Sequence, residues 1–182
     1  MKIQKEYGIT VKKADNLSEW YSQALLKTDL IDYGPSKGFI VLKPYGYSIW
    51  ESIKQIIDVR LKESGHQNAF LPTVIPESLL RKEEVHFSGF NSEVFWITQA
   101  GANSLQERLA LRPTSEAIAY YLFSNWVSSY KDLPMKLNFW NSAMRAEIKS
   151  TKPFIRNSEF LWQEGHTVHT NSKEAEEEVR FI

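Results

Sequence analysis

The sequence predicts an α+β fold in which helices flank a mostly antiparallel sheet. The clearest helical pattern covers Tyr47–Glu63, where apolar residues recur every three or four positions before Gly65 supplies a stop. Strand-like segments at Leu137–Ile148 and Glu159–Val168 are joined by a basic loop, as expected for the two arms of a long hairpin. Strands that are separated by helices but joined by a long hairpin favour α+β over alternating parallel units.

The remaining elements follow from turn residues, caps and periodicity. Asn16 begins a short helical pattern that runs through Lys27, and Gly34–Gly38 is a turn before the strand-like run Phe39–Leu42. Thr114 is expected to cap a helix that continues to about Tyr130. We also predict strands at Asn68–Leu71, Val94–Thr98 and Leu109–Arg112, a polar loop at Gly101–Ser104 and a short helix from Pro76 to about Glu84.

Composition excludes several classes of protein. The chain has 182 residues, with 22 basic and 22 acidic side chains, so no global charge indicates nucleic-acid or membrane binding. It has no cysteine, which excludes disulfides and cysteine-based zinc sites. The N-terminus lacks the apolar run of a signal peptide, and no stretch approaches a membrane span. We expect one soluble, cytoplasmic domain.

The last residues predict a helix that has only begun. Asn171 to Glu174 has the pattern of a capping box, and acidic residues follow in the first turns. The chain stops at Ile182, only about two turns later. We therefore expect the sequence to be part of a longer protein.

Chemistry concentrates on the predicted hairpin. Alternate residues of a strand share one face, so Phe160, Trp162, Glu164 and His166 would form one row. Such a face suits a small zwitterion and a polyanionic nucleotide better than a hydrophobic core. Arg145 and Glu147, taken alone, are more simply explained as a cross-strand ion pair. The alternative is that the guanidinium of Arg145 binds a phosphate or carboxylate while Glu147 accepts from an amino group.

A second constellation is Arg112-Pro113-Thr114-Ser115-Glu116. It could be an ordinary helix N-cap with acid in the first turn. A hydroxyl and a carboxylate at a helix entrance are also a good pair of acceptors for an ammonium group. The sequence has no Walker loop, no G-x-G-x-x-G and no histidine spacing typical of a metal site, so we predict no metal bound by protein ligands.

Together these residues resemble the first half of the catalytic domain of class II aminoacyl-tRNA synthetases, specifically prolyl-tRNA synthetases of the archaeal and eukaryotic type. The Tyr47–Glu63 helix and the strand ending at Pro72 resemble motif 1, the family's dimer-interface element. Arg112–Glu116 is similar to the proline-recognition loop, and Arg145–His166 is similar to motif 2. The segment Phe-Leu-Trp-Gln-Glu-Gly-His at 160–166 is highly specific to this family.

The resemblance implies roles for individual residues. Arg145 would be the catalytic residue, because it would contact both the prolyl carboxylate and the α-phosphate of ATP. The proline pocket would comprise Phe90, Thr114, Glu116, Arg145, Trp162, Glu164 and His166. ATP would be bound by Arg145, Glu147, Arg156, Asn157 and Phe160, with Mg²⁺ held by phosphate oxygens. The expected partners are L-proline, the proline tRNA and a second copy of the chain through motif 1.

Departures from the family pattern leave alternatives. Ala146 stands where a bulky aromatic is usual, and Ser158 where an arginine is common. Motif 3 and the anticodon-binding domain do not occur in this sequence, so residues 1–182 would be the N-terminal portion of the catalytic domain and inactive alone. The alternative function is a non-catalytic paralogue that keeps the proline pocket as a binding or regulatory module. A class II synthetase for another amino acid is disfavoured by the 160–166 segment.

Overall fold

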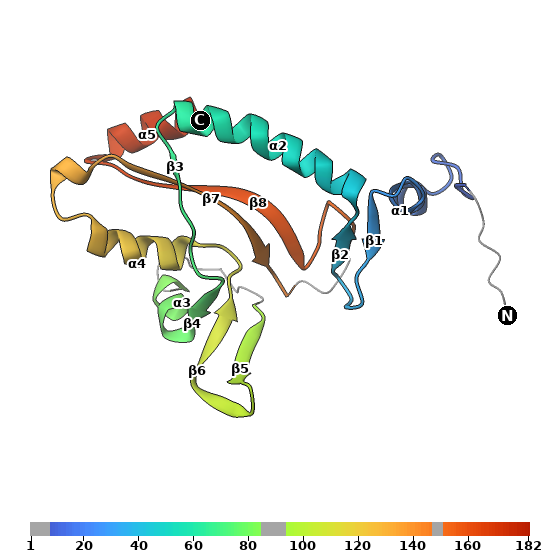
Figure 1. Cartoon of the computed structure of the whole chain (residues 1–182), viewed down its shortest axis with the longest axis horizontal. Coiled ribbons are helices and arrows are strands. Elements are labelled where there is room, and N and C mark those ends of the chain that lie inside the picture. The colour runs from blue at the N-terminus through green and yellow to red at the C-terminus, as the bar shows by residue number, and fades with distance from the viewer. Residues whose placement is uncertain (1–7, 85–93, 147–150) are drawn as a thin grey trace. The chain divides into compact units, whose positions relative to one another are not determined.

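The computed structural model describes residues 8–84, 94–146 and 151–182. These residues fall into two compact units. Unit 1 lies within Met1–Asp58 and Glu147–Glu159, and unit 2 comprises Val59–Ala146 and Phe160–Ile182. Figure 1 gives the order of the elements along the chain, and each unit is described separately.

Unit 1 contains a helix and a small hairpin. Helix α1 (Leu17–Lys27) begins as predicted, because the side chain of Asn16 accepts a hydrogen bond from the backbone N–H of Glu19. Strands β1 (Ile31–Tyr33) and β2 (Ile40–Leu42) pair antiparallel. Strand β1 was not predicted, since three residues are too few to show alternation.

Helix α2 (Pro44–Glu63) confirms the strongest prediction and begins three residues earlier than expected. Proline is well tolerated there, because the first turn of a helix needs no N–H donor. Gly65 adopts φ +90° just past the last turn, where a left-handed residue ends helices. The apolar stripe is largely exposed along α2: Ile49, Ile53, Ile56 and Ile57 retain 38–60% of their accessible surface.

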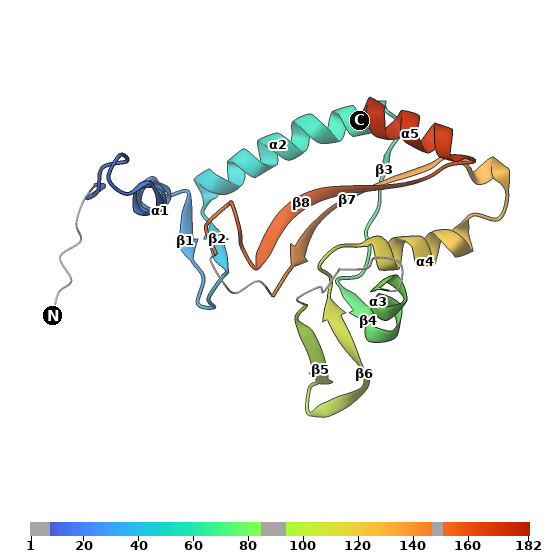
Figure 2. The same cartoon turned by 180° about the vertical axis from the view of Figure 1, so that it is seen from behind.

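Unit 2 contains two sheets of three strands. One has the order β3 (Gln67–Asn68), β7 (Met135–Met144), β8 (Glu159–Val168), and β7 and β8 run side by side as long curved ribbons in both views (Figures 1 and 2). The other has the order β4 (Val74–Pro76), β6 (Asn103–Leu111), β5 (Trp96–Ala100). Strand β3 pairs parallel with β7, whereas β4, β5 and β6 pair antiparallel. The predicted α+β fold is confirmed, with one short parallel pair.

Three helices and a 3₁₀ turn complete unit 2: α3 (Glu77–Glu84), α4 (Glu116–Trp126), η1 (Tyr130–Asp132) and α5 (Ser172–Phe181). Asn171 caps α5 as predicted, since its side chain accepts from the N–H of Glu174. A single apolar cluster connects α3 and α4 with strands of both sheets. It consists of Leu71, Ile75, Leu80, Ala110, Ala117, Ile118, Ala119, Phe123 and Phe139. Burial of these side chains contributes most of the stability of unit 2.

The predicted helix from Thr114 to about Tyr130 is wrong at both ends. Helix α4 begins at Glu116, and its N-cap is Ser115, whose side chain makes no capping bond. The hydroxyl of Thr114 instead donates to Glu116, and that of Ser115 donates to Glu164. These side chains are engaged at the site described below rather than at the helix end.

Other strand boundaries also differ from prediction. The strand expected at Asn68–Leu71 shrinks to β3, because the carbonyl groups of Leu71 and Pro72 accept hydrogen bonds from Arg112 rather than from a neighbouring strand. Strand β6 begins at Asn103, so the predicted polar loop is a two-residue turn in which Gly101 adopts φ +62°. Strand β4 was missed, since it is three residues long and ends in proline.

No helix among the described residues is both long enough and apolar enough to cross a bilayer.

Candidate active site

Glu164, on β8, lies at the centre of a buried hydrogen-bond network. Its side chain is 8% exposed. The carboxylate accepts from the backbone N–H and the hydroxyl of Ser115, from Asn141 Nδ2 at 2.9 Å and from His166 Nε2 at 3.3 Å. The hydroxyl of Thr114 lies 3.5 Å from the same carboxylate. One acidic side chain therefore ties the start of α4 to β7 and β8.

This network keeps Glu164 ionised. Burial acts to raise the pKa of its carboxyl, and hydrogen bonds from His166, Asn141 and Ser115 outweigh burial and lower the pKa to about 2. At neutral pH Glu164 is thus a carboxylate that receives donors from three elements.

Thr114 and Glu116 add acceptors at the same place. The hydroxyl of Thr114 donates to Glu116, so these two side chains are oriented together at the entrance to α4. Glu116, Glu164 and His166 have potential ligand atoms within 4.8 Å of one another, and among the described residues they form the group that could hold a metal ion. The carboxylate of Glu164 already accepts several N–H and O–H donors, so most of its acceptor positions are occupied within the protein.

The imidazole of His166 is fixed by two rings. Tyr120 packs edge-on against it with 5.7 Å between centroids, and Phe139 lies tilted at 5.7 Å. His166 Nε2 lies 3.3 Å from the carboxylate of Glu164, and we assign the Nε2–H tautomer because it donates to that carboxylate. The ring therefore has one donor committed to the network.

Arg145, just beyond the end of β7, lies against the aromatic part of the predicted row. Its Cζ atom is 5.3 Å from the ring centre of Phe160 and 5.6 Å from that of Trp162. The two rings meet edge-to-face at 5.5 Å, and Trp162 Nε1 donates to Asn141 at 2.5 Å. Contacts between Phe160 and Trp162 and between Glu164 and His166 confirm the shared face predicted from strand alternation.

Arg112 is a different kind of arginine. It is 3% exposed, and its guanidinium donates to the carbonyl oxygens of Leu71, Pro72 and Ser142. Burial lowers the pKa of Arg112, and the charge of Glu164 opposes that shift. The first residue of the Arg112–Glu116 motif therefore supports the backbone beneath the site.

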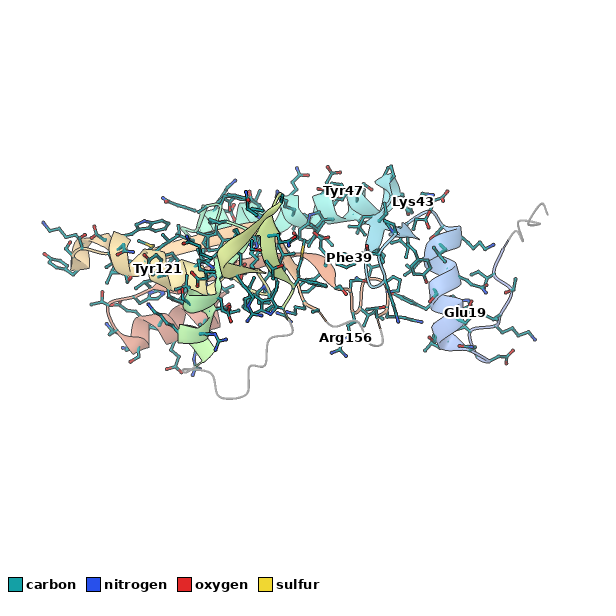
Figure 3. All side chains as sticks on the ribbon, turned by 90° about the horizontal axis from the view of Figure 1, so that it is seen from below. Glu19, Phe39, Lys43, Tyr47, Tyr121 and Arg156 are labelled. Carbon is teal, nitrogen blue, oxygen red and sulfur yellow. The ribbon has the colours of Figure 1, made fainter. Side chains whose placement is uncertain are left out.

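The loop that precedes β8 belongs to unit 1 and carries Arg156 and Asn157. Arg156 is exposed, and Figure 3 shows its side chain on this loop. Asn157 is 9% exposed and lines a cavity of about 90 Å³ together with Gly38 and Lys152. Ser158, at the departure from the family pattern, is fully buried, and its N–H donates to the carbonyl of Gly38.

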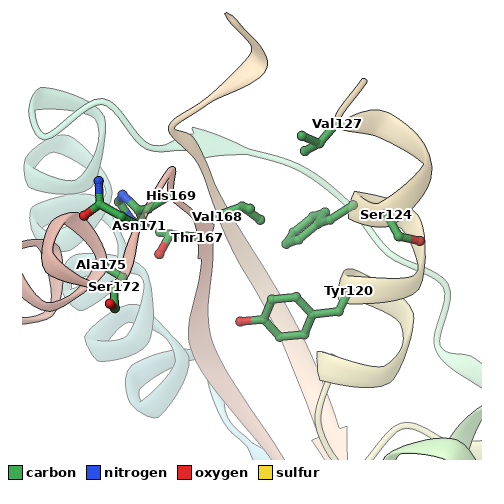
Figure 4. A pocket seen from close by; sticks show the side chains of 10 residues that line it. Tyr120, Ser124, Val127, Thr167, Val168, His169, Asn171, Ser172 and Ala175 are labelled. Carbon is green, nitrogen blue, oxygen red and sulfur yellow. The ribbon is translucent and has the colours of Figure 1, made fainter. Parts of the chain in front are cut away.

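A larger cavity of about 650 Å³ lies in unit 2 (Figure 4). Tyr120 and Ser124 of α4 and Val127 just after it form one wall, and the opposite wall comes from the end of β8 and the start of α5. None of the predicted site residues lines this cavity. Tyr120, which lines the cavity, connects it to the Glu164 network, because its ring contacts His166.

The structure brings seven predicted residues together in unit 2: Thr114, Glu116, Arg145, Phe160, Trp162, Glu164 and His166. Arg156 and Asn157 lie in unit 1, while Phe90 and Glu147 fall outside the described residues. Sequence reasoning did not assign roles to Ser115, Asn141 or the Pro113 carbonyl, which accepts from Arg145 at 3.3 Å. Ser115 at least stands inside the motif that was singled out. Asn141 gave no local signal.

Comparison with known proteins shows which proteins this chain resembles. Residues 95–181 match the model of the tRNA synthetase class II core domain for G, H, P, S and T. The chain is 63% identical over 175 residues to a proline–tRNA ligase of Cenarchaeum symbiosum, covering 96% of this chain and 37% of that protein. It is 54% identical to a proline–tRNA ligase of Acetoanaerobium sticklandii, covering 93% of this chain and 36% of that one. The chain thus spans about a third of the length of these curated relatives.

Solved structures agree. A prolyl-tRNA synthetase from Cryptosporidium parvum complexed with halofuginone and AMPPNP matches 96% of this chain and 34% of its own, with a TM-score of 0.88 and 44% identity. The same enzyme complexed with L-proline and AMP gives a TM-score of 0.86 at 41% identity over the same shares of the two chains. Family model, relatives and solved structures agree that the fold is that of the class II tRNA synthetase core, and the chain is similar over nearly its whole length to prolyl-tRNA synthetases.

Proposed function

We propose that the protein to which this chain belongs is a proline–tRNA ligase. It would activate L-proline with ATP to prolyl-adenylate and then transfer the prolyl group to the proline tRNA. The observation that carries this proposal is that Thr114, Glu116 and Glu164 lie together at the start of α4, while Arg145 lies over Trp162, whose indole N–H joins the same network through Asn141. Such a site fits a zwitterion whose ammonium donates and whose carboxylate accepts.

The binding of proline follows from this geometry. The secondary ammonium of proline has two N–H groups, which Glu116 and the Thr114 oxygen would accept. Ser115, which lies between Thr114 and Glu116 in the sequence, donates hydrogen bonds to Glu164. The Thr114–Glu116 pair is therefore oriented before substrate arrives. The aromatic ring of Trp162, together with Phe90, would enclose the ring of the amino acid.

The reaction needs no covalent nucleophile on the protein. The carboxylate of proline attacks the α-phosphorus, a new C–O–P bond forms, and the bond to the bridging oxygen breaks to release pyrophosphate. Arg145 would touch both the carboxylate and the α-phosphate, so it would stabilise the charge that develops between them. Catalysis would come from positioning and electrostatics.

ATP would be held from several sides. Glu147 would recognise the adenine amino group, Phe160 would stack on the ring, and Arg156 with Asn157 would contact the phosphate end. Mg²⁺ would be held by phosphate oxygens, which its preference for oxygen ligands and water favours. The bound AMPPNP and AMP of the Cryptosporidium parvum structures support ATP as co-substrate.

We also propose a homodimer that acts in the cytoplasm. The exposed apolar face of α2, which includes Tyr45 and Ile56 at about 60% exposure, is the support for a dimer interface. Light scattering on an Ile53→Glu/Ile56→Glu variant would test it, with Lys54→Glu as a control on the same helix. A dimer that survives both isoleucine changes would contradict this interface.

The decisive test is proline-dependent ATP–pyrophosphate exchange by a full-length chimera. Residues 1–182 would replace the equivalent segment of the Cenarchaeum symbiosum relative, with which they share 63% identity. We expect exchange with proline well above exchange with alanine, since each missing methylene costs about 10- to 200-fold. Faster exchange with threonine or serine than with proline would refute the assignment.

The second candidate is a non-catalytic paralogue that binds proline as a module. The presence of Thr114, Glu116, Arg145, Arg156 and His166 together argues against loss of catalysis. Calorimetric titration with proline distinguishes the two, because a binding module would take up proline in a chimera that shows no exchange.

Residues 1–182 would form the N-terminal portion of the catalytic domain, and expressed alone they should not be a competent synthetase. The relatives are about three times as long, and the resemblance implies a second ATP-binding arginine in motif 3. We expect weak ATP binding and self-association of the isolated chain. A monodisperse monomer with robust exchange would contradict both expectations.

A further inference from the structure

The loop that carries Arg156 is fastened to the N-terminal helix by Lys152. Its ammonium donates to the Ser18 carbonyl at 2.8 Å, to the Ser18 hydroxyl, and to the Ser22 hydroxyl at 3.1 Å. Ser18 and Lys152 are 134 positions apart in the sequence, so this contact joins distant parts of unit 1. A lysine ammonium has three donors, and three acceptors use all of them.

Tyr21 makes a second fastening beside the first. Its hydroxyl donates to the carbonyl of Pro153 at 2.9 Å, and its ring lies 6.0 Å from the Lys152 ammonium. Pro153 itself is buried. Burial raises the pKa of Tyr21 above 10, so the hydroxyl remains a donor at neutral pH.

The two fastenings act on Arg156 through a short closed turn. The Lys152 N–H donates to the Arg156 carbonyl at 2.7 Å, and the Arg156 N–H donates back to the Lys152 carbonyl at 2.8 Å. At the far end of the turn the Ser158 N–H donates to the Gly38 carbonyl at 2.8 Å. The backbone of Arg156 is therefore held between two anchored residues.

We propose that Lys152 and Tyr21 are positioning residues, which use helix α1 to fix the loop that presents Arg156 to the phosphate end of ATP. The inference rests on the proposed function for the ligand, while the anchoring concerns the chain itself. Lys152 would not contact phosphate, since its three donors are engaged on Ser18 and Ser22. Its hydrogen bonds orient the loop, and Arg156 meets the nucleotide.

The kinetic test uses Lys152→Ala, Tyr21→Phe and the double variant in the full-length chimera. Each single change should raise KM for ATP about 3- to 10-fold and leave KM for proline unchanged, because only the nucleotide end is loosened. The double variant should raise KM by less than the product of the two, since both side chains fasten the same turn. Lys152→Arg should recover part of the loss.

Two controls separate positioning from charge. Tyr21→Phe removes one hydrogen bond without changing charge, so a purely electrostatic role of Lys152 would leave KM for ATP unmoved in that variant. Lys37→Ala removes an exposed positive charge from the same unit, and Tyr33→Phe removes an exposed hydroxyl. Neither control should change KM for ATP by more than about twofold.

A readout that does not need activity is amide hydrogen exchange in the 182-residue chain. The amides of Ile155, Arg156 and Ser158 should exchange at least tenfold faster in Lys152→Ala and in Tyr21→Phe than in the unmodified chain. Unchanged exchange at these amides would overturn the anchoring. Faster amide exchange in the variants with an unchanged KM for ATP would overturn the positioning role. If the unmodified chimera were inactive while these amides still exchanged faster in the variants, the proposed function would fail and the anchoring would stand.

Discussion

Two arginines of unit 2, Arg112 and Arg145, show how differently the same side chain is used a short distance apart. Arg112 is buried and donates to three backbone carbonyl oxygens. Arg145 is half-buried, donates to the Pro113 carbonyl at 3.3 Å and lies over two aromatic rings. The first guanidinium has its donors committed to the fold, while the second is the one that we propose binds a ligand. Partners, rather than residue type, separate these two arginines.

The largest expected effect is the loss of Arg145. In the full-length chimera, Arg145→Ala should lower proline-dependent exchange by about 10²- to 10³-fold, because charge stabilisation in the transition state is removed. A stopped-assay measurement of pyrophosphate exchange checks this. If Arg145→Ala kept more than about a tenth of the unmodified exchange rate, Arg145 would not be the catalytic arginine, and the contrast with Arg112 would be wrong.

Arg112 should show the reverse behaviour. Arg112→Met takes the donor away from the carbonyl oxygens of Leu71, Pro72 and Ser142, so we expect the free energy of unfolding to fall by about 3 kcal/mol. Urea unfolding of the 182-residue chain measures it, with Arg145→Ala as the matched control that should cost less than about 1 kcal/mol. Equal costs for the two variants would contradict the comparison.

The carboxylate of Glu164, whose charge acts on Arg112, gives a pH-dependent prediction. The pKa of Glu164 is lowered from 4.5 to about 2 in the folded protein, so its stabilising contribution is present above about pH 4.5 and is lost as the pH falls through about 2. The amount is on the order of 3 kcal/mol at neutral pH. Glu164→Gln should remove this dependence when unfolding is measured from pH 7 down to pH 2. A variant whose stability falls with acid as steeply as the unmodified chain would show that other groups carry the effect.

The smallest expected effect concerns the aromatic rings that lie beside Arg145. Trp162→Phe keeps a ring beside Arg145 but removes the hydrogen bond to Asn141, which costs about 1 kcal/mol. We expect KM for proline to rise roughly fivefold in the chimera, with kcat for exchange nearly unchanged. Phe160→Leu serves as its partner variant, and it should act on KM for ATP instead.

The sequence predicted what local signals specify. The period of α2, the Asn171 cap of α5 and the alternation along β8 are each contained in a few neighbouring residues. Prediction failed where the local structure depends on partners that are distant in the sequence. Thr114 was assigned to a helix cap because the local pattern of hydroxyl and acidic residues is that of an N-cap. It does not show that the Thr114 hydroxyl donates to Glu116 and the Ser115 hydroxyl to Glu164.

The supporting residues of the site show the same limit. Asn141 reaches Glu164 from 23 positions away, and Arg112 reaches Leu71 from 41. Both contacts depend on strand register and on how the chain returns to the sheet, which periodicity does not encode. The residues that the resemblance assigns to substrate could therefore be named from short motifs, whereas those that hold them in place could not.

The anchoring of Lys152 on α1 also has a consequence for synthesis on the ribosome. The partners Ser18 and Lys152 are 134 positions apart, so at 5–20 residues per second the helix waits roughly 7 to 27 s for its partner to be made. During that time the whole of residues 59–146, most of unit 2, is translated. Unit 1 therefore cannot complete its fold until its second segment, residues 147–159, has been synthesised. Chaperone contacts with the nascent chain should concentrate on its α1 and β1–β2 segments until residue 158 has left the exit tunnel.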